Sequence, residues 1–155
     1  PKNGHLKWKA VYQPGKVVAT GYKKGKRILT ETIETTKPAY KIVLKADRSA
    51  MTADGRDVTI VTVEILDQKG RVVPDACQIL TMHLDGDARI LGAGNGDPSY
   101  NGEDHPKSQH CREFSIPAFN GLAQFIIQSG QVPSAITLSC TSEKLRNGSL
   151  RIDTF

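Results

Sequence analysis

The segment VVATGYKKGKRILTETIET, residues 17–35, carries the pattern that decides the fold class. Two runs rich in apolar and β-branched residues, 17–22 and 27–35, flank the tetrapeptide Lys23–Lys26. Gly25 can take the positive φ that a tight hairpin turn requires. β-branched side chains at this density favour a pleated strand over a helix. The segment therefore predicts a β-hairpin.

A third strand is expected immediately before this hairpin. Apolar residues alternate along residues 6–12, and the run ends at Gln13-Pro14-Gly15. In this register Trp8 is predicted to be a core side chain rather than an exposed platform for stacking on a sugar. Three strands with one apolar face cannot close a sandwich alone, so we expect a longer parent chain to supply the missing strands.

A boundary is expected near residue 38. Pro38 cannot donate a backbone hydrogen bond and disfavours helix before it, so residues 36–39 are predicted to be a linker. The charge changes at the same place: residues 1–40 hold nine basic and two acidic side chains, a net +7, whereas 41–155 hold 12 and 14, a net −2. The basic side chains alternate with apolar ones or lie at turns, which is typical of solvated strands and does not predict a nucleic-acid partner.

The same strand pattern restarts after the linker. Seven further strands are expected, at 41–47, 58–67, 77–84, 88–93, 122–129, 135–142 and 149–153. Short turns separate most of them, and no segment shows the spacing of an amphipathic helix. The chain is therefore predicted to be all-β: residues 38–155 form an immunoglobulin-like β-sandwich, and residues 1–37 are the last strands of a neighbouring immunoglobulin-like domain.

One long irregular segment interrupts this rhythm. Residues 95–117 are predicted to be a loop, and loops of this length are often functional. Asn95 and Asp97 at its start are expected to cap turns through their side chains. The polar side chains that follow are the candidate contact residues of the domain, namely Tyr100, Glu103, Asp104, His105 and His110.

The sequence predicts no catalytic, cofactor-binding or metal-binding residue. Asp97, Glu103 and Asp104 could pair as carboxylates for glycoside chemistry, but no apolar enclosure near them would raise the pKa of an acid. Asp85-Gly86-Asp87 lacks the rest of a calcium-binding loop and is predicted to be a turn. His83 alternates with apolar neighbours and is predicted to be a surface or edge imidazole.

The three cysteines predict no disulfide framework, because their number is odd in a chain of 155 residues. None of them lies at metal-ligand spacing from another cysteine or a histidine. Cys77 and Cys140 stand in apolar runs and are expected to be small core residues, and Cys111 gives only a weak signal for any site.

The chain resembles a known family at several points. Leu6–Lys26 resembles the pattern W-x-V-x-Y-x-P-G-x-L-x-A-x-G-Y-x-x-G-K of bacterial β-galactosidases of glycoside hydrolase family 2. Ala10-Val11 stands where the family often has Val-Pro. The resemblance continues at Thr36–Ala39, Leu44–Arg48, Ala53–Val58, Val61–Asp67, Gly70–Ala76, Gly92–Pro98 and Ala118–Ala123.

This resemblance implies two immunoglobulin-like domains that lie C-terminal to a catalytic barrel. The family's catalytic glutamates belong to the barrel, so none is transferred to this chain. The fragment itself is then expected to be no enzyme, with a glycoside hydrolase of β-galactosidase type as its parent. Its expected partners are the catalytic and other domains of that parent, and its exposed N-terminal strands allow a homo-oligomer. The family resemblance favours a periplasmic or extracellular location, and no apolar run is long enough to predict a membrane span.

Two other classes of protein remain as alternatives. The first is a carbohydrate-binding module, although such modules usually expose several aromatic side chains, and this chain has 6% aromatic residues and one tryptophan. The second is an adhesin-type immunoglobulin-like repeat, which would occur beside further copies of the same sandwich. An enzyme in its own right would depend on the loop carboxylates alone.

Overall fold

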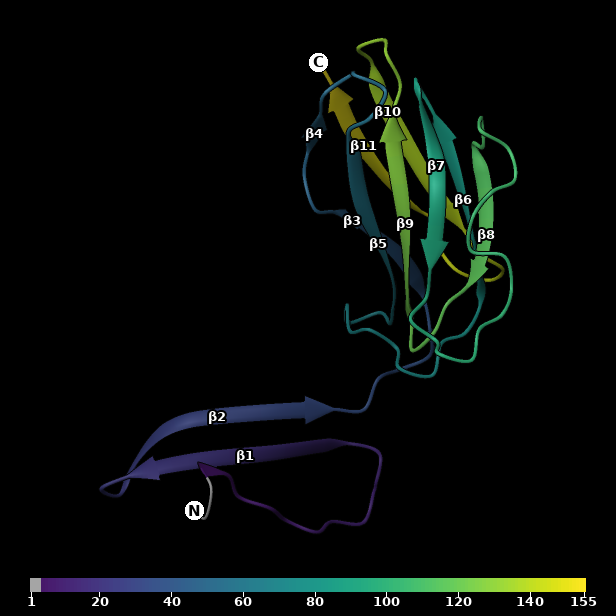
Figure 1. Ribbon diagram of the computed structural model, residues 1–155. Coiled ribbons are helices and arrows are strands. Elements are labelled where there is room, and N and C mark those ends of the chain that lie inside the picture. Colours follow the sequence, from purple (N-terminus) through teal and green to yellow (C-terminus); the bar gives the residue numbers. More distant parts are fainter. Residues whose placement is uncertain (1–3) are drawn as a thin grey trace. The chain divides into compact units, whose positions relative to one another are not determined.

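The computed structural model describes residues 4–155 (Figure 1). The contacts divide the chain into two compact units, Pro1–Thr35 and Thr36–Phe155. Residues 1–3, the start of the predicted N-terminal segment, lie outside the described residues. The regular elements are β-strands, which confirms the all-β prediction.

The first unit is a two-stranded antiparallel hairpin. Strand β1 spans Lys16–Lys23 and strand β2 spans Lys26–Glu34, with Lys23 paired to Lys26 across the turn. Lys24 and Gly25 have φ values of 49° and 75°. Two consecutive residues with positive φ match the twist of the flanking strands, so the predicted hairpin is confirmed.

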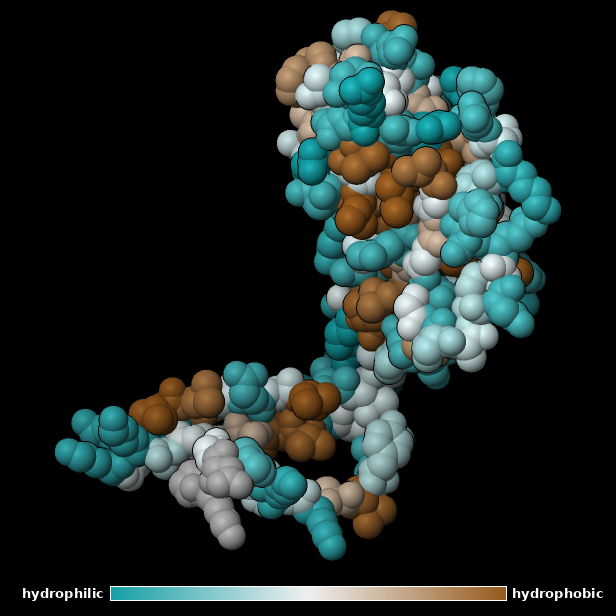
Figure 2. All heavy atoms as spheres, viewed as in Figure 1, coloured by the Kyte–Doolittle hydropathy of each residue, from teal (hydrophilic) through white to brown (hydrophobic). Residues whose placement is uncertain are grey.

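The predicted strand over residues 6–12 is wrong. No strand among the described residues pairs with this segment, and the sheet of the first unit contains β1 and β2 alone among the described residues. Trp8, predicted to be a core side chain, is 75% exposed, because a single pair of strands has no second layer to bury it. Figure 2 shows hydrophobic (brown) patches on the surface of this unit. Its further exposed apolar side chains are Leu6, Val11, Tyr12, Val17, Val18, Tyr22, Ile28, Leu29 and Ile33.

The second unit is a sandwich of two sheets. One sheet has the strand order β4-β11-β10-β6-β8, and the other has the order β3-β5-β9-β7. All pairings between neighbouring strands are antiparallel except that of β4 with β11, which is parallel. The strands are β3 (Lys41–Ala46), β4 (Ala50–Met51), β5 (Val58–Leu66), β6 (Ile79–Asp85), β7 (Ala88–Gly94), β8 (Glu113–Pro117), β9 (Leu122–Ser129), β10 (Ala135–Thr141) and β11 (Gly148–Thr154).

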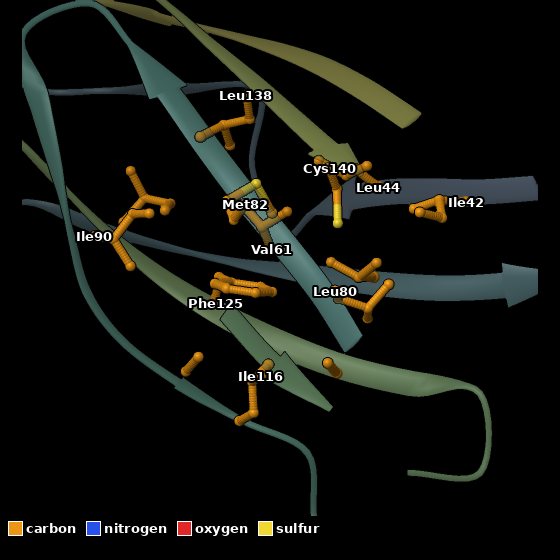
Figure 3. Close-up of a cluster of buried hydrophobic side chains, with 14 of the residues drawn as sticks. Ile42, Leu44, Val61, Leu80, Met82, Ile90, Ile116, Phe125, Leu138 and Cys140 are labelled. Atoms are coloured by element: carbon orange, nitrogen blue, oxygen red, sulfur yellow. The ribbon is translucent and has the colours of Figure 1, made fainter. Parts of the chain in front are cut away.

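Alternation along the strands builds the core between the two sheets. In β9 every second residue from Ala123 to Ser129 is buried, and β6 and β10 alternate in the same way. Phe125 is fully buried and lies among side chains from both sheets (Figure 3). The residues drawn around it include Val61, Leu80, Met82, Ile90, Ile116, Leu138 and Cys140. This two-layer packing is the predicted immunoglobulin-like sandwich.

Two short strands and one cysteine depart from the sequence-based expectations. Strand β8, with five residues, lies inside the segment predicted as a continuous loop, and strand β4, with two residues, was not predicted. Strands this short carry little periodicity. Cys77 is exposed, since it precedes β6 instead of lying within it. Cys140 is buried as predicted, and burial raises the pKa of its thiol to about 12.

Phe125 and Ile126 make a matched pair for testing the core, because they are neighbours on β9 with opposite orientation. Phe125→Ala should lower the free energy of unfolding by about 3–5 kcal/mol, since it leaves a cavity between the sheets. Ile126 is 37% exposed, so Ile126→Ala should cost about 1 kcal/mol or less. Urea unfolding of both variants measures the difference, and equal losses would contradict this account of the core.

Candidate functional site

The contact loop, defined here as residues 95–112, joins the two sheets of the sandwich. It leaves β7, the last strand of the four-stranded sheet, and enters β8, the last strand of the other sheet (Figure 1). Tyr100, Glu103, Asp104, His105 and His110, the candidate residues, all lie within it. The loop is therefore placed along one open side of the sandwich.

Backbone carbonyls of the contact loop accept hydrogen bonds from strands of both sheets. The Ala93 N–H donates to the Asp104 carbonyl over 2.7 Å, and the Ile90 N–H donates to the Cys111 carbonyl over 2.9 Å. From the other sheet, the Leu84 N–H donates to the Arg112 carbonyl over 2.8 Å. The loop thus covers part of the free edge of β7, which would otherwise offer unpaired backbone groups to another strand.

Tyr100 anchors the contact loop and is not one of its exposed side chains. Its ring is partly buried against the core of the sandwich. Its hydroxyl donates a hydrogen bond to the Glu103 carbonyl over 3.0 Å, and its backbone N–H donates to the Asp97 carbonyl over 3.1 Å. These contacts hold the next turn of the loop in place.

The charged candidates are paired in short, exposed contacts. Glu103 Oε1 lies 2.7 Å from Lys107 Nζ, and Asp104 Oδ1 lies 2.6 Å from His105 Nδ1. The hydrogen bond from Lys107 lowers the pKa of the Glu103 carboxyl, and that from His105 lowers the pKa of the Asp104 carboxyl. A general acid for glycoside cleavage needs the opposite shift of pKa, so this arrangement does not supply one.

Asn95 and Asp97 at the start of the contact loop behave as the sequence predicts, whereas His110 lies apart from the other candidate residues. The Asp97 N–H donates to Asn95 Oδ1 over 3.0 Å, and the Ser99 N–H donates to Asp97 Oδ1 over 2.8 Å, which confirms that Asn95 and Asp97 cap turns. The two Ser99 hydrogen bonds lower the pKa of the Asp97 carboxyl. His110 is exposed and borders a depression at the end of the sandwich, which Tyr100, Glu103, Asp104 and His105 do not line.

Outside the contact loop, His83 lies on the outward face of β6. Its Nδ1 lies 2.9 Å from Glu113 Oε2, and its Nε2 lies 3.4 Å from Thr141 Oγ1. The prediction of a surface imidazole is confirmed, but β6 is an interior strand between β10 and β8, so His83 is not at a sheet edge. The predicted turn at Asp85-Gly86-Asp87 joins β6 to β7, and Gly86 there has a φ of 109°.

Asp67 is a buried charge that the sequence analysis missed. It follows β5, is 0% exposed, and accepts a hydrogen bond from the Arg71 side-chain Nε over 2.9 Å. It also accepts backbone N–H groups of Lys37 (2.9 Å), Lys69 (2.9 Å) and Arg71 (3.0 Å). The Arg71 guanidinium, together with these N–H groups, holds the pKa of the carboxyl well below its ordinary value. Asp67 thereby fixes the linker residue Lys37 to the sandwich.

Within residues 4–155 no group of three or more His, Cys, Asp or Glu side chains is arranged to hold a metal ion. No helix in the same range is long and apolar enough to cross a membrane.

Relatives of known identity show the class of protein to which this sandwich belongs. Beta-galactosidase BoGH2A of Bacteroides ovatus is 34% identical over 150 residues, which cover 97% of this chain and 17% of that protein. A family 2 glycosyl hydrolase from Bacteroides cellulosilyticus superposes with a TM-score of 0.84 at 28% identity, over 96% of this chain and 18% of that one. A beta-glycosidase from Bacteroides vulgatus superposes with a TM-score of 0.80 at 28% identity, over 99% and 19%. The chain is therefore similar to a region of family 2 glycoside hydrolases.

The family follows from the match of the sandwich itself. Residues 42–151 match the family described as glycoside hydrolase family 2 C-terminal domain 5, and the chain belongs to this family. Residues 1–29 match a different family, described as a domain of unknown function (DUF4982). The resemblance to bacterial family 2 enzymes is thus confirmed. The chain spans less than a fifth of the length of these relatives, so it corresponds to a small part of each of them.

The Asp67 network predicts how stability changes with pH. The pKa of the Asp67 carboxyl is lower in the folded protein than its ordinary value of 3.8. Ionised Asp67 therefore contributes stability that is fully present above the ordinary pKa and is lost as the pH falls through the folded-state pKa. Asp67→Asn should lower the urea midpoint at pH 7 and flatten its fall between pH 5 and pH 2. Asp75→Asn, at an exposed position, should retain the wild-type profile. An unchanged profile in Asp67→Asn would contradict the assignment.

Proposed function

We propose that this chain is a non-catalytic accessory region of a larger hydrolase of β-galactosidase type. The observation that carries the proposal is the state of its carboxylates. Glu103 and Asp104 are exposed and paired with Lys107 and His105, and Asp67 is buried but held by Arg71. Neither arrangement provides the acid of raised pKa and the facing carboxylate that glycoside hydrolysis needs.

The first unit supports a role that depends on a parent chain. Its hairpin exposes apolar side chains from both strands, which an isolated soluble protein would rarely retain. Its match to a family other than that of the sandwich is consistent with the last strands of a preceding domain. We infer that residues 1–37 complete an immunoglobulin-like domain whose other strands come from the parent hydrolase.

The contact loop is the proposed surface toward other domains of the parent. Tyr100 and the backbone bonds to β7 hold its conformation, so its exposed side chains are presented on a fixed frame. Glu103 and His105 are 63% and 78% exposed at their side chains, and neither is needed for packing the sandwich. Fixed, exposed polar groups of this kind suit the rim of an interdomain contact.

An activity assay tests the proposed non-catalytic role directly. The purified 155-residue chain should not hydrolyse o-nitrophenyl β-galactoside above the background of a mock purification, because no acid and nucleophile pair is present in its described residues. Turnover that co-elutes with the chain through two further chromatographic steps would overturn the proposal.

The contact loop is tested by substitutions that spare its anchor. The double variant Glu103→Ala/His105→Ala should leave the melting temperature of this chain within about 1–2 °C, because both side chains are exposed. In the full-length parent it should lower activity, assembly or melting temperature. Glu143→Ala/Lys144→Ala, an exposed pair after β10, is the matched control and should change neither protein. A parent enzyme that is indifferent to the loop variant would exclude the contact role.

A further inference from the structure

The four-stranded sheet of the sandwich carries apolar side chains on its outward face as well as toward the core. Ile60 of β5 and Ile126 of β9 pair across the sheet and point away from the core, and they are 41% and 37% exposed. Leu91 of β7 is 40% exposed and precedes Gly92, which pairs with Ile126. We call these three side chains the outer patch. Figure 2 shows hydrophobic side chains gathered over β5, β9 and β7.

The outward face of the five-stranded sheet is different. Its strand β10 alternates cleanly between buried apolar and outward side chains, which is typical of an antiparallel sheet with one face in water. The outward residues of β10 and of the neighbouring β6 and β8 are mainly polar and include Thr81, His83, Ser115, Thr137 and Ser139. In β5 and β9, Ile60-Val61 and Phe125-Ile126-Ile127 are consecutive apolar residues, a pattern typical of strands covered on both faces.

The polar side chains that surround the outer patch are paired with one another across neighbouring strands. The three pairs are Lys45 with Glu64 (2.8 Å), Gln124 with Thr62 (3.2 Å) and Arg89 with Gln128 (2.7 Å). A polar group that already has a partner loses less when water is excluded than one that has none. An apolar centre with a rim of paired polar groups is the usual anatomy of a protein interface.

The contact loop borders the outer patch. Paired residues of a sheet direct their side chains to the same face, so a Cβ at Gly92 would point to the same side as Ile126. That Cβ would lie 3.1 Å from the Asp104 carbonyl oxygen and 3.9 Å from His105 Cβ. The contact loop therefore lies against the outward face of β7, and the loop and the outer patch form one continuous surface.

The size of the outward face indicates what covers it. Four strands about 4.8 Å apart, each contributing about seven residues, give a face of about 450 Å². A stable complex of separate proteins buries about 800 Å² on each partner, so this face alone is too small for a stable dimer. Interfaces between domains of one polypeptide bury about 600–1,500 Å² in total, half of it on each side, and this face is of that size.

A partner on the same polypeptide also needs less binding energy, because the covalent connection keeps it at a high effective concentration. Relatives of this chain have room for such a partner, since the chain covers 17%, 18% and 19% of three of them. We propose that the outer patch is the centre of an interface with another domain of the parent hydrolase, whose facing surface is flat and apolar. The inference rests on the proposed accessory role, and it makes the contact loop the polar rim of a larger interface.

Cysteine labelling of the 155-residue chain and of the full-length parent tests the proposal. Ile126→Cys places a thiol in the outer patch, and Thr137→Cys places one at an exposed position on the outward face of the other sheet. N-Ethylmaleimide should modify Ile126→Cys roughly tenfold more slowly, or slower still, in the parent than in the chain, because a covered thiol reacts only when the interface opens. Thr137→Cys should react equally fast in both proteins. Peptide mass spectrometry measures each cysteine separately.

Three results would overturn the proposal. The first is an equal rate for Ile126→Cys in the chain and in the parent, and the second is equal protection of Thr137→Cys in the parent. The third is protection of Ile126→Cys in the chain itself that grows with its concentration, which would indicate a second copy as the occupant. The accessory role fails separately, through turnover of the galactoside by the chain, so the two failures are distinguishable.

A matched pair of further substitutions separates docking from folding. Ile60→Glu places a charge beside residue 126 in the outer patch, and Ile79→Glu places one at an isoleucine that is 63% exposed on β6. In the parent that carries Ile126→Cys, Ile60→Glu should raise the labelling rate to that of the chain with the same two changes. Ile79→Glu should leave the protection intact. Retained protection with Ile60→Glu, in a chain that still melts cooperatively, would exclude the outer patch as the interface.

Discussion

The burial of two sheet faces against each other is the constraint on which the second unit depends. Each sheet is stable in water only when its apolar face is covered. Phe125 of one sheet and Ile116 and Leu138 of the other bury each other between the two faces. Burial of a large apolar side chain contributes about 1.5–3 kcal/mol, and the alternation along β6, β9 and β10 places such side chains in register. The hairpin of the first unit has no second layer, so its apolar side chains stay exposed.

The strands long enough to show this alternation were predictable from the sequence, whereas contacts between distant residues were not. The hairpin turn at Gly25 and the run over β5 have local signals of their own. Trp8 was misjudged because alternation indicates a face and not whether another sheet covers it. Cys77 was misjudged because the sequence did not define where β6 begins.

In the candidate site, too, the local features could be predicted from the sequence and the contacts between distant residues could not. Turn capping by Asn95 and Asp97 depends on residues two positions apart and could be predicted. The burial of Asp67 depends on Lys37, thirty residues earlier, and only the fold brings the two together. The depression that His110 borders gathers residues from the turns after β4, β6 and β9 and from the contact loop, and only the fold brings these segments together. Tyr100, a candidate contact residue from the sequence, also anchors the contact loop, through packing and a hydrogen bond that only the fold reveals.

The position of β11 has a consequence for how the domain is made. This last strand of the sandwich lies between β4 and β10, buries Ile152 completely, and pairs with both neighbours. During synthesis the residues up to Thr141 therefore emerge with one side of β10 unpaired and with an incomplete inner face. The five-stranded sheet cannot close until its final strand has been synthesised, which favours folding of the domain as one unit late in its translation over stepwise folding from its start.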